Sequence, residues 1–346
     1  MKMIDLLTSA YNKQASDLHI SVGTQPIIRN NGVLERITEE VLTPQATEEM
    51  AKEIIPVHLW KKFKEKGELD FSYGIPGLSR FRVNAYHQRS CISLAIRVVP
   101  VSIPTLNQLS LPPVLAKIVE QPQGLFLVTG PTGSGKSTTL AAIIQQMNDT
   151  LSKHIITLED PIEYLHKHHR SIINQREVGF DTQNFANGLR AALRQDPDVI
   201  LVGEMRDLET IQTAITAAET GHLVLGTLHT SSAPSTINRM IDVFPADQQT
   251  QIRFQLASVL VGVFSQRLLP LKTGTGRTVA TELLVNTAAV ANLIRNEKIH
   301  QLINVMQTSR EIGMHTIETS VTKLLQKQLI SPEVASPFIK ERRRHG

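Results

Sequence analysis

The sequence is poor in cysteine and has no long apolar run. One cysteine, Cys91, stands among 346 residues, which excludes a disulfide within the chain and a zinc site of several cysteines. The longest apolar runs, GLFLV and LASVLVGVF, fall far short of the roughly 20 residues that a membrane-spanning helix needs. The opening MKMIDLLTSAYNKQ has no apolar stretch typical of a signal peptide. We therefore expect a cytoplasmic protein that reaches a membrane only through a partner.

Basic charge and large aromatic side chains are also scarce. The formal net charge is +4, and the chain has four tyrosines and one tryptophan. A nucleic-acid motor usually combines a stronger basic surface with aromatic residues on which bases stack. We expect no nucleic-acid partner. The apolar fraction of 41% and the charged fraction of 20% are instead typical of a soluble globular protein.

Two different sequence patterns predict two domains of mixed α/β class. Residues 1–98 alternate short strand-like runs with charged helical stretches, one of them capped at Thr43, as in an α+β domain. Prolines cluster in VVPVSIPTLNQLSLPPV, and because proline interrupts regular structure we expect a linker at 99–113. Residues 114–346 begin with apolar strands that alternate with helices, which is typical of a parallel sheet covered on both faces.

The part of the chain after about residue 246 is predicted to be mostly helical. DQQTQIRFQLASVLVGVF and AAVANLIRNEKIHQLINVM carry apolar residues at helical spacing. The tail ERRRHG is interpreted as a solvated end, with a contact to membrane lipid as the alternative.

A phosphate-binding loop is the most specific motif in the sequence. GPTGSGKST follows the apolar strand GLFLVT, precedes a helical stretch and satisfies G-x-x-x-x-G-K-[ST] in its usual context. Glycines let backbone N–H groups converge on phosphates at a helix N-terminus. Lys136 is expected to reach the β- and γ-phosphates, and Ser137 to bind Mg²⁺. We therefore expect ATP and Mg²⁺ as ligands of Gly130, Pro131, Thr132, Gly133, Ser134, Gly135, Lys136, Ser137 and Thr138.

Two acidic positions follow other apolar strands. DVILVGE ends in Glu204, which at that sheet edge can hold Mg²⁺ directly or through water; a surface carboxylate is the alternative. EDPIE follows the strand HIITL, and Glu163 lies beyond the bend at Pro161. Hydrolysis needs a group that orients the attacking water. Spacing favours Glu163 for this task but leaves Glu159 and Asp160 open.

Histidines occur in two groups with different interpretations. His222 and His229 flank the strand LVLGTL and lie about 23 Å apart on an extended chain, too far to share a metal. Each either reports the nucleotide state by hydrogen bonding or is an ordinary core or edge histidine. His166, His168 and His169 stand beside two basic residues, which oppose a cation, and are interpreted as solvated surface.

These blocks resemble the secretion ATPase superfamily of type II and type IV systems. The resemblance covers nearly the whole chain and rests on GPTGSGKST, TLEDPIE, DPDVILVGEMRD and GHLVLGTLHT, with ASDLHISVGTQPIIRNNG and RFRVNAY in the first part. It implies a PAS-like first domain and a RecA-like ATPase domain with a helical C-terminal part. It also implies a homohexamer with ATP between the two domains of a subunit.

The resemblance implies a role for each candidate residue. Glu163 would be the catalytic glutamate, Glu204 the Walker B residue and His229 a γ-phosphate sensor, alongside the catalytic Lys136. Arginines of the first domain would close over the phosphates, and the matching positions are Arg80, Arg82 and Arg97. Their spacing in RFRVN puts the first two on one face of a strand.

Within the superfamily, the chain is most similar to the type IV pilus retraction ATPases, the PilT group. Extension ATPases usually carry an extra N-terminal domain and a four-cysteine zinc insert, which this sequence lacks. The group's signature AIRNLIRE corresponds to AVANLIRN, where Ala291 and Asn296 replace an arginine and a glutamate. Implied partners are an inner-membrane pilus platform protein and an accessory ATPase paralogue. The alternatives are an accessory PilU-like ATPase and a related secretion or DNA-transfer ATPase.

Overall fold

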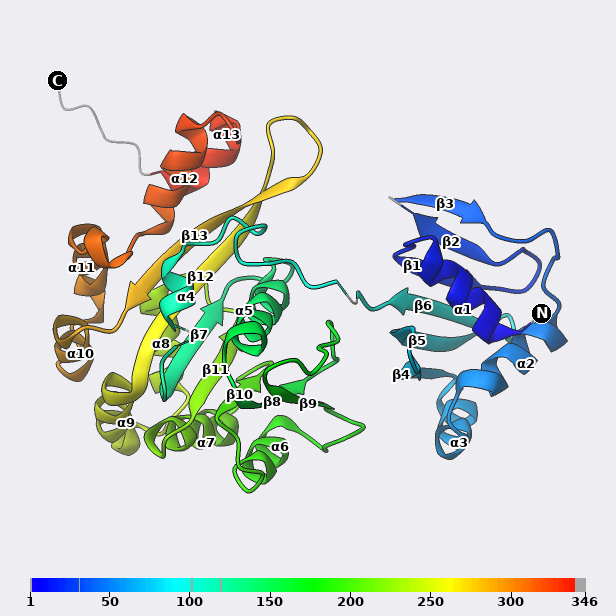
Figure 1. Ribbon diagram of the computed structural model, residues 1–346, viewed down its shortest axis with the longest axis horizontal. Helices are drawn as coiled ribbons and strands as arrows, with labels where there is room; N and C mark the ends of the chain where they lie inside the picture. The colour runs from blue at the N-terminus through cyan, green and yellow to red at the C-terminus, as the bar shows by residue number, and fades with distance from the viewer. Residues whose placement is uncertain (1, 31, 101, 119, 340–346) are drawn as a thin grey trace. The chain divides into compact units, whose positions relative to one another are not determined.

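The computed structural model describes residues 2–30, 32–100, 102–118 and 120–339, so the tail 341–346 lies outside the described residues. The chain divides into two compact units. The N-terminal unit comprises Met1–Ser102 together with Glu163–Leu165, and the C-terminal unit comprises Ile103–Ile162 and His166–Gly346. The predicted α/β class is confirmed, because each unit contains one β-sheet with helices packed against it (Figure 1).

The N-terminal unit is built on a six-stranded antiparallel sheet with the strand order β3-β2-β1-β6-β5-β4. Alternating apolar residues of the strands pack with helices into a single core that includes Leu18, Phe63 and Phe81. The predicted cap is confirmed: the Thr43 side chain accepts a hydrogen bond from the Ala46 N–H at the start of α2. The elements are α1 (Met3–Asn12), β1 (Asp17–Ile20), β2 (Ile27–Asn30), β3 (Val33–Arg36), α2 (Pro44–Ile54), α3 (Val57–Lys66), β4 (Glu68–Ile75), β5 (Ser79–Gln88) and β6 (Cys91–Val98).

The C-terminal unit contains a seven-stranded sheet with the order β13-β12-β7-β11-β10-β8-β9. Its strands are β7 (Gly124–Thr129), β8 (His154–Glu159), β9 (Ile172–Glu177), β10 (Val199–Val202), β11 (Leu223–Leu228), β12 (Leu260–Pro270) and β13 (Arg277–Val285). All neighbours are parallel except β13, which pairs antiparallel with β12. The carboxyl ends of β7, β11, β10 and β8 therefore lie side by side at one edge of the sheet.

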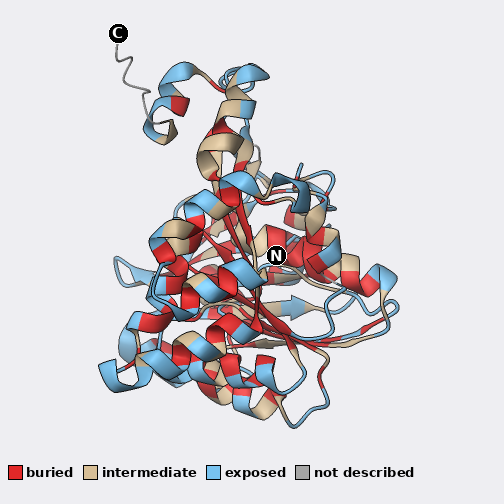
Figure 2. Ribbon diagram, turned by 90° about the vertical axis from the view of Figure 1, so that its left-hand side faces the viewer, coloured by how far each residue is buried: buried red, intermediate tan, exposed pale blue. Residues whose placement is uncertain are grey.

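Helices cover both faces of this sheet, which explains the near-continuous apolar strands. Leu125 and Leu127 of β7 belong to one core, whereas Phe126 and Val128 belong to the core on the opposite face. Figure 2 shows the buried strands in red between helices with pale blue outer faces (Figure 2). The helices are α4 (Val114–Ile118), α5 (Lys136–Thr150), α6 (Phe185–Ala192), α7 (Leu208–Glu219), α8 (Ala233–Asp242), α9 (Ala246–Val259), α10 (Ala288–Arg295), α11 (Leu302–Thr308), α12 (Ile317–Gln326) and α13 (Pro332–Ala335).

The helix expected over 247–264 is wrong beyond Val259, where α9 ends and β12 begins. The apolar run LVGVF adds to the sheet beside β7, so its burial comes from strand pairing rather than from a helical face. The β-branched Val261 and Val263 and the turn-forming KTGTG before β13 favour this hairpin. The strand β13 (Arg277–Val285) also departs from the mostly helical prediction, whereas the elements after it are helical, as expected.

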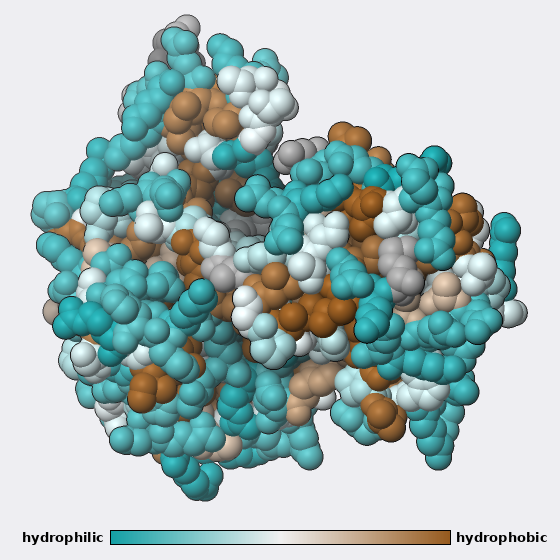
Figure 3. Space-filling model, turned by 45° about the vertical axis from the view of Figure 1, so that its right-hand side comes forward, coloured by the Kyte–Doolittle hydropathy of each residue, from teal (hydrophilic) through white to brown (hydrophobic). Residues whose placement is uncertain are grey.

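Among the residues that the structure describes, no helix is long and apolar enough to cross a membrane. Most of the face in Figure 3 is polar, and apolar side chains gather there in separate groups (Figure 3).

A buried carboxylate joins three C-terminal elements. Glu282 of β13 is 5% exposed, and its two oxygens accept hydrogen bonds from the Ala233 N–H (2.8 Å) and the Ile317 N–H (3.2 Å). These N–H groups begin α8 and α12, so one side chain satisfies two helix N-termini. Burial raises the pKa of Glu282, which the two N–H groups partly oppose.

We predict that Glu282→Ala destabilises the C-terminal unit by about 2–4 kcal/mol, because two buried N–H groups lose their acceptor. Denaturant unfolding of the full chain should show the loss. The exposed Glu333, in the first turn of α13, provides the control Glu333→Ala. A loss no larger than that of the control would contradict the structural role of Glu282.

Candidate active site

The loop between β7 and α5 has the geometry of a phosphate cradle. Gly133 and Gly135 have φ values of 76° and 90°, a left-handed region that favours glycine. Gly135 is the N-cap of α5, so the N–H groups of the first helical turn face the loop. A Cβ at Gly130 would lie 2.3 Å from the Gln266 carbonyl oxygen, which excludes any larger residue there.

Lys136 and the following hydroxyls lie at the start of α5. The Lys136 ammonium donates hydrogen bonds to the carbonyl oxygens of Gly130 (2.9 Å) and Pro131 (3.2 Å). It therefore lies across the mouth of the loop, within the turn where phosphates would bind. Ser137 and Thr138 are half-buried beside it. The nine residues predicted to bind phosphate, 130–138, thus form the loop after β7 and the first turn of α5.

Gln266 supports the loop from β12, and sequence analysis missed it. Its side chain is 2% exposed; the amide nitrogen donates to the Ser134 carbonyl oxygen (2.6 Å), and the amide oxygen accepts from the Thr139 hydroxyl (2.8 Å). One buried amide thus joins the loop to the first turn of α5. The neighbouring Ser265 hydroxyl similarly bonds the Thr129 hydroxyl at 2.7 Å. Sequence analysis does not find these residues because it predicts a helix where β12 begins and no strand at 265–270.

Glu204 and His229 meet at the same edge of the sheet. Glu204 lies just beyond β10 and His229 just beyond β11, and these two strands are parallel neighbours. The His229 Nε2 lies 2.7 Å from a carboxylate oxygen of Glu204, which also accepts a hydrogen bond from Arg206 Nε. β11 pairs in turn with β7, and the Gly130 N–H bonds the Leu228 carbonyl oxygen. The pair therefore adjoins the phosphate loop.

The loop that carries Glu163 follows β8, at the fourth of these strand ends. Glu163 itself is exposed. Glu159, one of the alternatives, is bound inside the C-terminal unit: one of its oxygens accepts from the Thr157 hydroxyl (2.6 Å) and from the Gln175 amide (3.1 Å). Asp160 is exposed at the strand end. Of the three acidic residues, Glu163 lies farthest from the end of β8. Glu159 is held by hydrogen bonds to residues of β8 and β9.

The three arginines gather on one face of the N-terminal sheet. Arg80 and Arg82 alternate with the buried Phe81 on β5, and Arg82 pairs directly with Arg97 of β6. Like charges at directly opposed positions are unfavourable in a sheet, so an anion on this face would stabilise it. Arg97 Nε also donates to an Asp17 carboxylate oxygen at 3.2 Å.

The other histidines have structural surroundings. His222 Nδ1 bonds the Ala217 carbonyl oxygen (3.0 Å) near the end of α7, which assigns it to the edge-histidine interpretation. His168 and His169 are exposed, but the solvated interpretation is wrong for His166. Its imidazole is half-buried, and burial lowers its pKa to about 4 because the charged form loses hydration.

Mg²⁺ chemistry fits the donors present. Over residues 2–30, 32–100, 102–118 and 120–339, no group of three or more His, Cys, Asp and Glu side chains is arranged to hold a metal ion. Mg²⁺ in nucleotide sites typically needs only one or two protein oxygens besides phosphates and water. The Ser137 hydroxyl and the Glu204 carboxylate supply oxygen donors of that kind.

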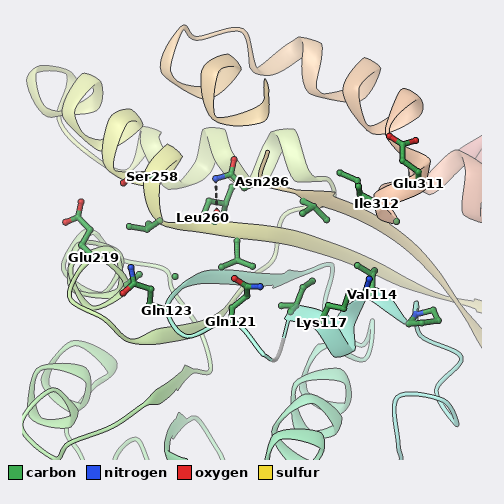
Figure 4. A pocket seen from close by; sticks show the side chains of 18 of the residues that line it. Val114, Lys117, Gln121, Gln123, Glu219, Ser258, Leu260, Asn286, Glu311 and Ile312 are labelled. Atoms are coloured by element: carbon green, nitrogen blue, oxygen red, sulfur yellow. Dashed lines mark hydrogen bonds between the residues drawn. The ribbon is translucent and has the colours of Figure 1, made fainter. Parts of the chain in front are cut away.

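A cavity of about 1070 Å³ lies away from these residues. It opens where β7 and β12 begin, at the edge of the sheet opposite the phosphate loop (Figure 4). Its lining mixes amides, such as Gln121 and Asn286, with charges of both signs, such as Lys117 and Glu311. None of the candidate site residues lines it.

We predict that Gln266→Ala weakens nucleotide binding by up to about 30-fold, since two hydrogen bonds of about 1 kcal/mol each, to Ser134 and Thr139, are lost. Titration with a fluorescent ADP analogue measures the change. Gln255→Ala is the matched control, because Gln255 lies on α9 and bonds Glu219 at the surface. Unchanged affinity in Gln266→Ala would contradict the supporting role.

A second prediction concerns how the stability of the protein falls at acidic pH. Between about pH 6.5 and 4 the unfolded chain protonates His166 while the folded protein does not, so stability present above pH 6.5 is lost as the pH falls towards 4. The variant His166→Gln should lose part of this acid sensitivity in urea unfolding measured across that range. His300→Gln, at an exposed site, controls for the loss of an imidazole. Identical pH profiles for wild type and His166→Gln would contradict the assignment.

Comparisons with known proteins agree on one family. The model of the family described as "Type II/IV secretion system protein" matches residues 2–336. The chain is 46% identical over 335 residues to the type IV pilus retraction ATPase PilT of Pseudomonas aeruginosa, covering 97% of both chains. It is 40% identical to the type IV pilus ATPase PilU of the same organism, covering 97% of this chain and 88% of that one.

A solved structure gives the same result. The crystal structure of the pilus retraction motor PilT with bound ADP matches with a TM-score of 0.90 at 46% identity, covering 99% of this chain and 98% of the other. The resemblance inferred from the four motifs is thereby confirmed. The chain belongs to the type II/IV secretion system protein family.

Proposed function

We propose that this chain is an ATP-hydrolysing motor that powers retraction of type IV pili. The observation that carries the proposal is the meeting of the phosphate loop with the Glu204–His229 pair at one sheet edge. The 46% identity to PilT over 97% of both chains supports retraction as the output. The domains are assigned as a PAS-like domain (1–98), a linker (99–113) and a RecA-like ATPase domain (114–346).

Each residue at the edge has a physical task in this proposal. N–H groups of the loop bind the phosphates of ATP, and Lys136 exchanges its carbonyl partners for phosphate oxygens. When bound at Ser137 and Glu204, Mg²⁺ neutralises phosphate charge. The Glu163 carboxylate accepts a hydrogen bond from the attacking water and orients it towards the γ-phosphate. Arg80, Arg82 and Arg97 supply positive charge for the phosphates.

His229 is proposed to report the loss of the γ-phosphate. Its Nε2 bonds Glu204, and we expect this contact to respond to a change of phosphate charge at the neighbouring loop. A change of nucleotide therefore alters the hydrogen bonding of the loop that leads into α8. We propose that the motor is a homohexamer, cytoplasmic and peripheral to the inner membrane, which acts on a pilus platform protein.

An accessory role is the second candidate. The 40% identity to PilU over nearly the whole chain favours it over a secretion or DNA-transfer function. The departures from the retraction signature point the same way, although Ala291 is buried in α10 and so does not itself alter the exposed face. A non-catalytic regulatory subunit, unlike either of these ATPases, would not sustain ATP turnover in the purified chain.

Glu163→Gln tests the proposal. The variant should bind ATP normally but hydrolyse it about 10²–10⁴-fold more slowly, since the amide cannot take part in proton transfer from water. Steady-state phosphate release and nucleotide titration separate the two quantities. Glu333→Gln provides the exposed control. Hydrolysis within a few-fold of wild type would remove Glu163 from the mechanism.

The same variant tests the output in cells. Deletion of the gene should leave surface pili but abolish twitching, and the Glu163→Gln allele should fail to restore movement. Loss of surface pili in the deletion strain would contradict retraction and indicate assembly.

A further inference from the structure

We propose that two side chains of β9, Glu177 and Gln175, are positioning residues that hold the loop of Glu163. The inference rests on the proposed function, in which Glu163 orients water. Both side chains bind main-chain N–H groups, one on each side of the segment 163–165. Neither belongs to a motif that the sequence analysis singled out.

Glu177 holds the side of the loop before Glu163. Its carboxylate is 1% exposed, and one oxygen accepts a hydrogen bond from the Ile162 N–H at 3.1 Å. Ile162 immediately precedes Glu163 and is itself buried. A buried carboxylate is costly unless it is hydrogen-bonded, and this hydrogen bond offsets part of the cost of burying Glu177.

Glu177 is itself well fixed. It pairs with Glu159 in the parallel register of β8 and β9, and its N–H donates to an Asp181 carboxylate oxygen at 2.8 Å. Its carbonyl oxygen accepts the Asp181 N–H, also at 2.8 Å. The support for Ile162 therefore comes from the sheet rather than from a mobile surface group.

Gln175 holds the side after Glu163. Its amide oxygen accepts from the His166 N–H at 2.9 Å, and its amide nitrogen donates to Glu159 at 3.1 Å. That carboxylate also bonds the Thr157 hydroxyl at 2.6 Å. The amide is thus oriented by β8, and three residues, Glu163 to Leu165, lie between the two held positions.

The spacing explains why both contacts matter for catalysis. With Ile162 and His166 fixed, the short segment between them has few conformations, and the Glu163 carboxylate is held over a small range. Misplacement of a reacting group by 1 Å can lower a rate about 10²-fold. Loss of either contact should therefore affect turnover more than nucleotide affinity.

The experiment is a double-mutant cycle with single-turnover hydrolysis and nucleotide titration on the full chain. Glu177→Ala should lower the hydrolysis rate about 10–100-fold while the Kd for ATP stays within about twofold. Glu177→Gln keeps an acceptor oxygen for Ile162 and should recover most of the rate. In the Glu163→Gln background, Glu177→Ala should slow the residual reaction less than about twofold, because it acts only through Glu163.

A second variant and a control variant distinguish a positioning effect from a folding defect. Gln175→Ala removes the other contact and should give the same pattern if Glu177→Ala does not fold. Asp198→Ala removes a carboxylate that bonds the His154 N–H at the opposite end of β8, and should leave turnover unchanged.

Each failure has its own signature. Equal losses in Glu177→Ala and Asp198→Ala, or additive losses in the Glu163→Gln background, overturn the positioning role while Glu163 remains essential. Near-normal turnover in Glu163→Gln alone instead contradicts the proposed role of Glu163.

Discussion

The parallel pairing of β7, β11, β10 and β8 is the constraint on which the site depends. Parallel register brings four carboxyl ends to one edge, so the phosphate loop, His229, Glu204 and the loop of Glu163 follow adjacent strands. Helices on both faces keep these strands buried, and the edge is left as the place where polar groups can gather. The chemistry of the site is therefore a consequence of sheet topology.

Around this edge, buried or half-buried polar side chains hold main-chain atoms of the protein in place. Gln266 bonds the phosphate loop, Glu177 and Gln175 bond the loop of Glu163, and Glu282 bonds the start of the helix after His229. Each uses a side chain on a strand to bind main-chain atoms of a neighbouring loop. Once its hydrogen bonds are made, burying such a polar side chain costs little free energy. The hydrogen bonds also leave the loops few alternative conformations.

The phosphate loop can be predicted from the sequence because phosphate binding requires particular residue types at a fixed spacing. Glu204 and His229 can each be predicted as a candidate residue from the sequence. Their 2.7 Å contact, however, follows from the pairing of β10 with β11, which the spacing of residues along the chain does not reveal. The run LASVLVGVF fits a helix or a strand equally well, so β12 and with it Gln266 were missed. His166 was misread because its exposure depends on the fold of its loop.

A crystal structure of the protein with Mg²⁺ and a non-hydrolysable ATP analogue tests the central claim most directly. The account predicts a triphosphate against the N–H groups of the phosphate loop, with the Lys136 ammonium moved from the carbonyl oxygens of Gly130 and Pro131 to phosphate oxygens. The Ser137 hydroxyl would contact the metal ion. A nucleotide bound elsewhere, or one that leaves Lys136 on those carbonyl oxygens, would contradict it.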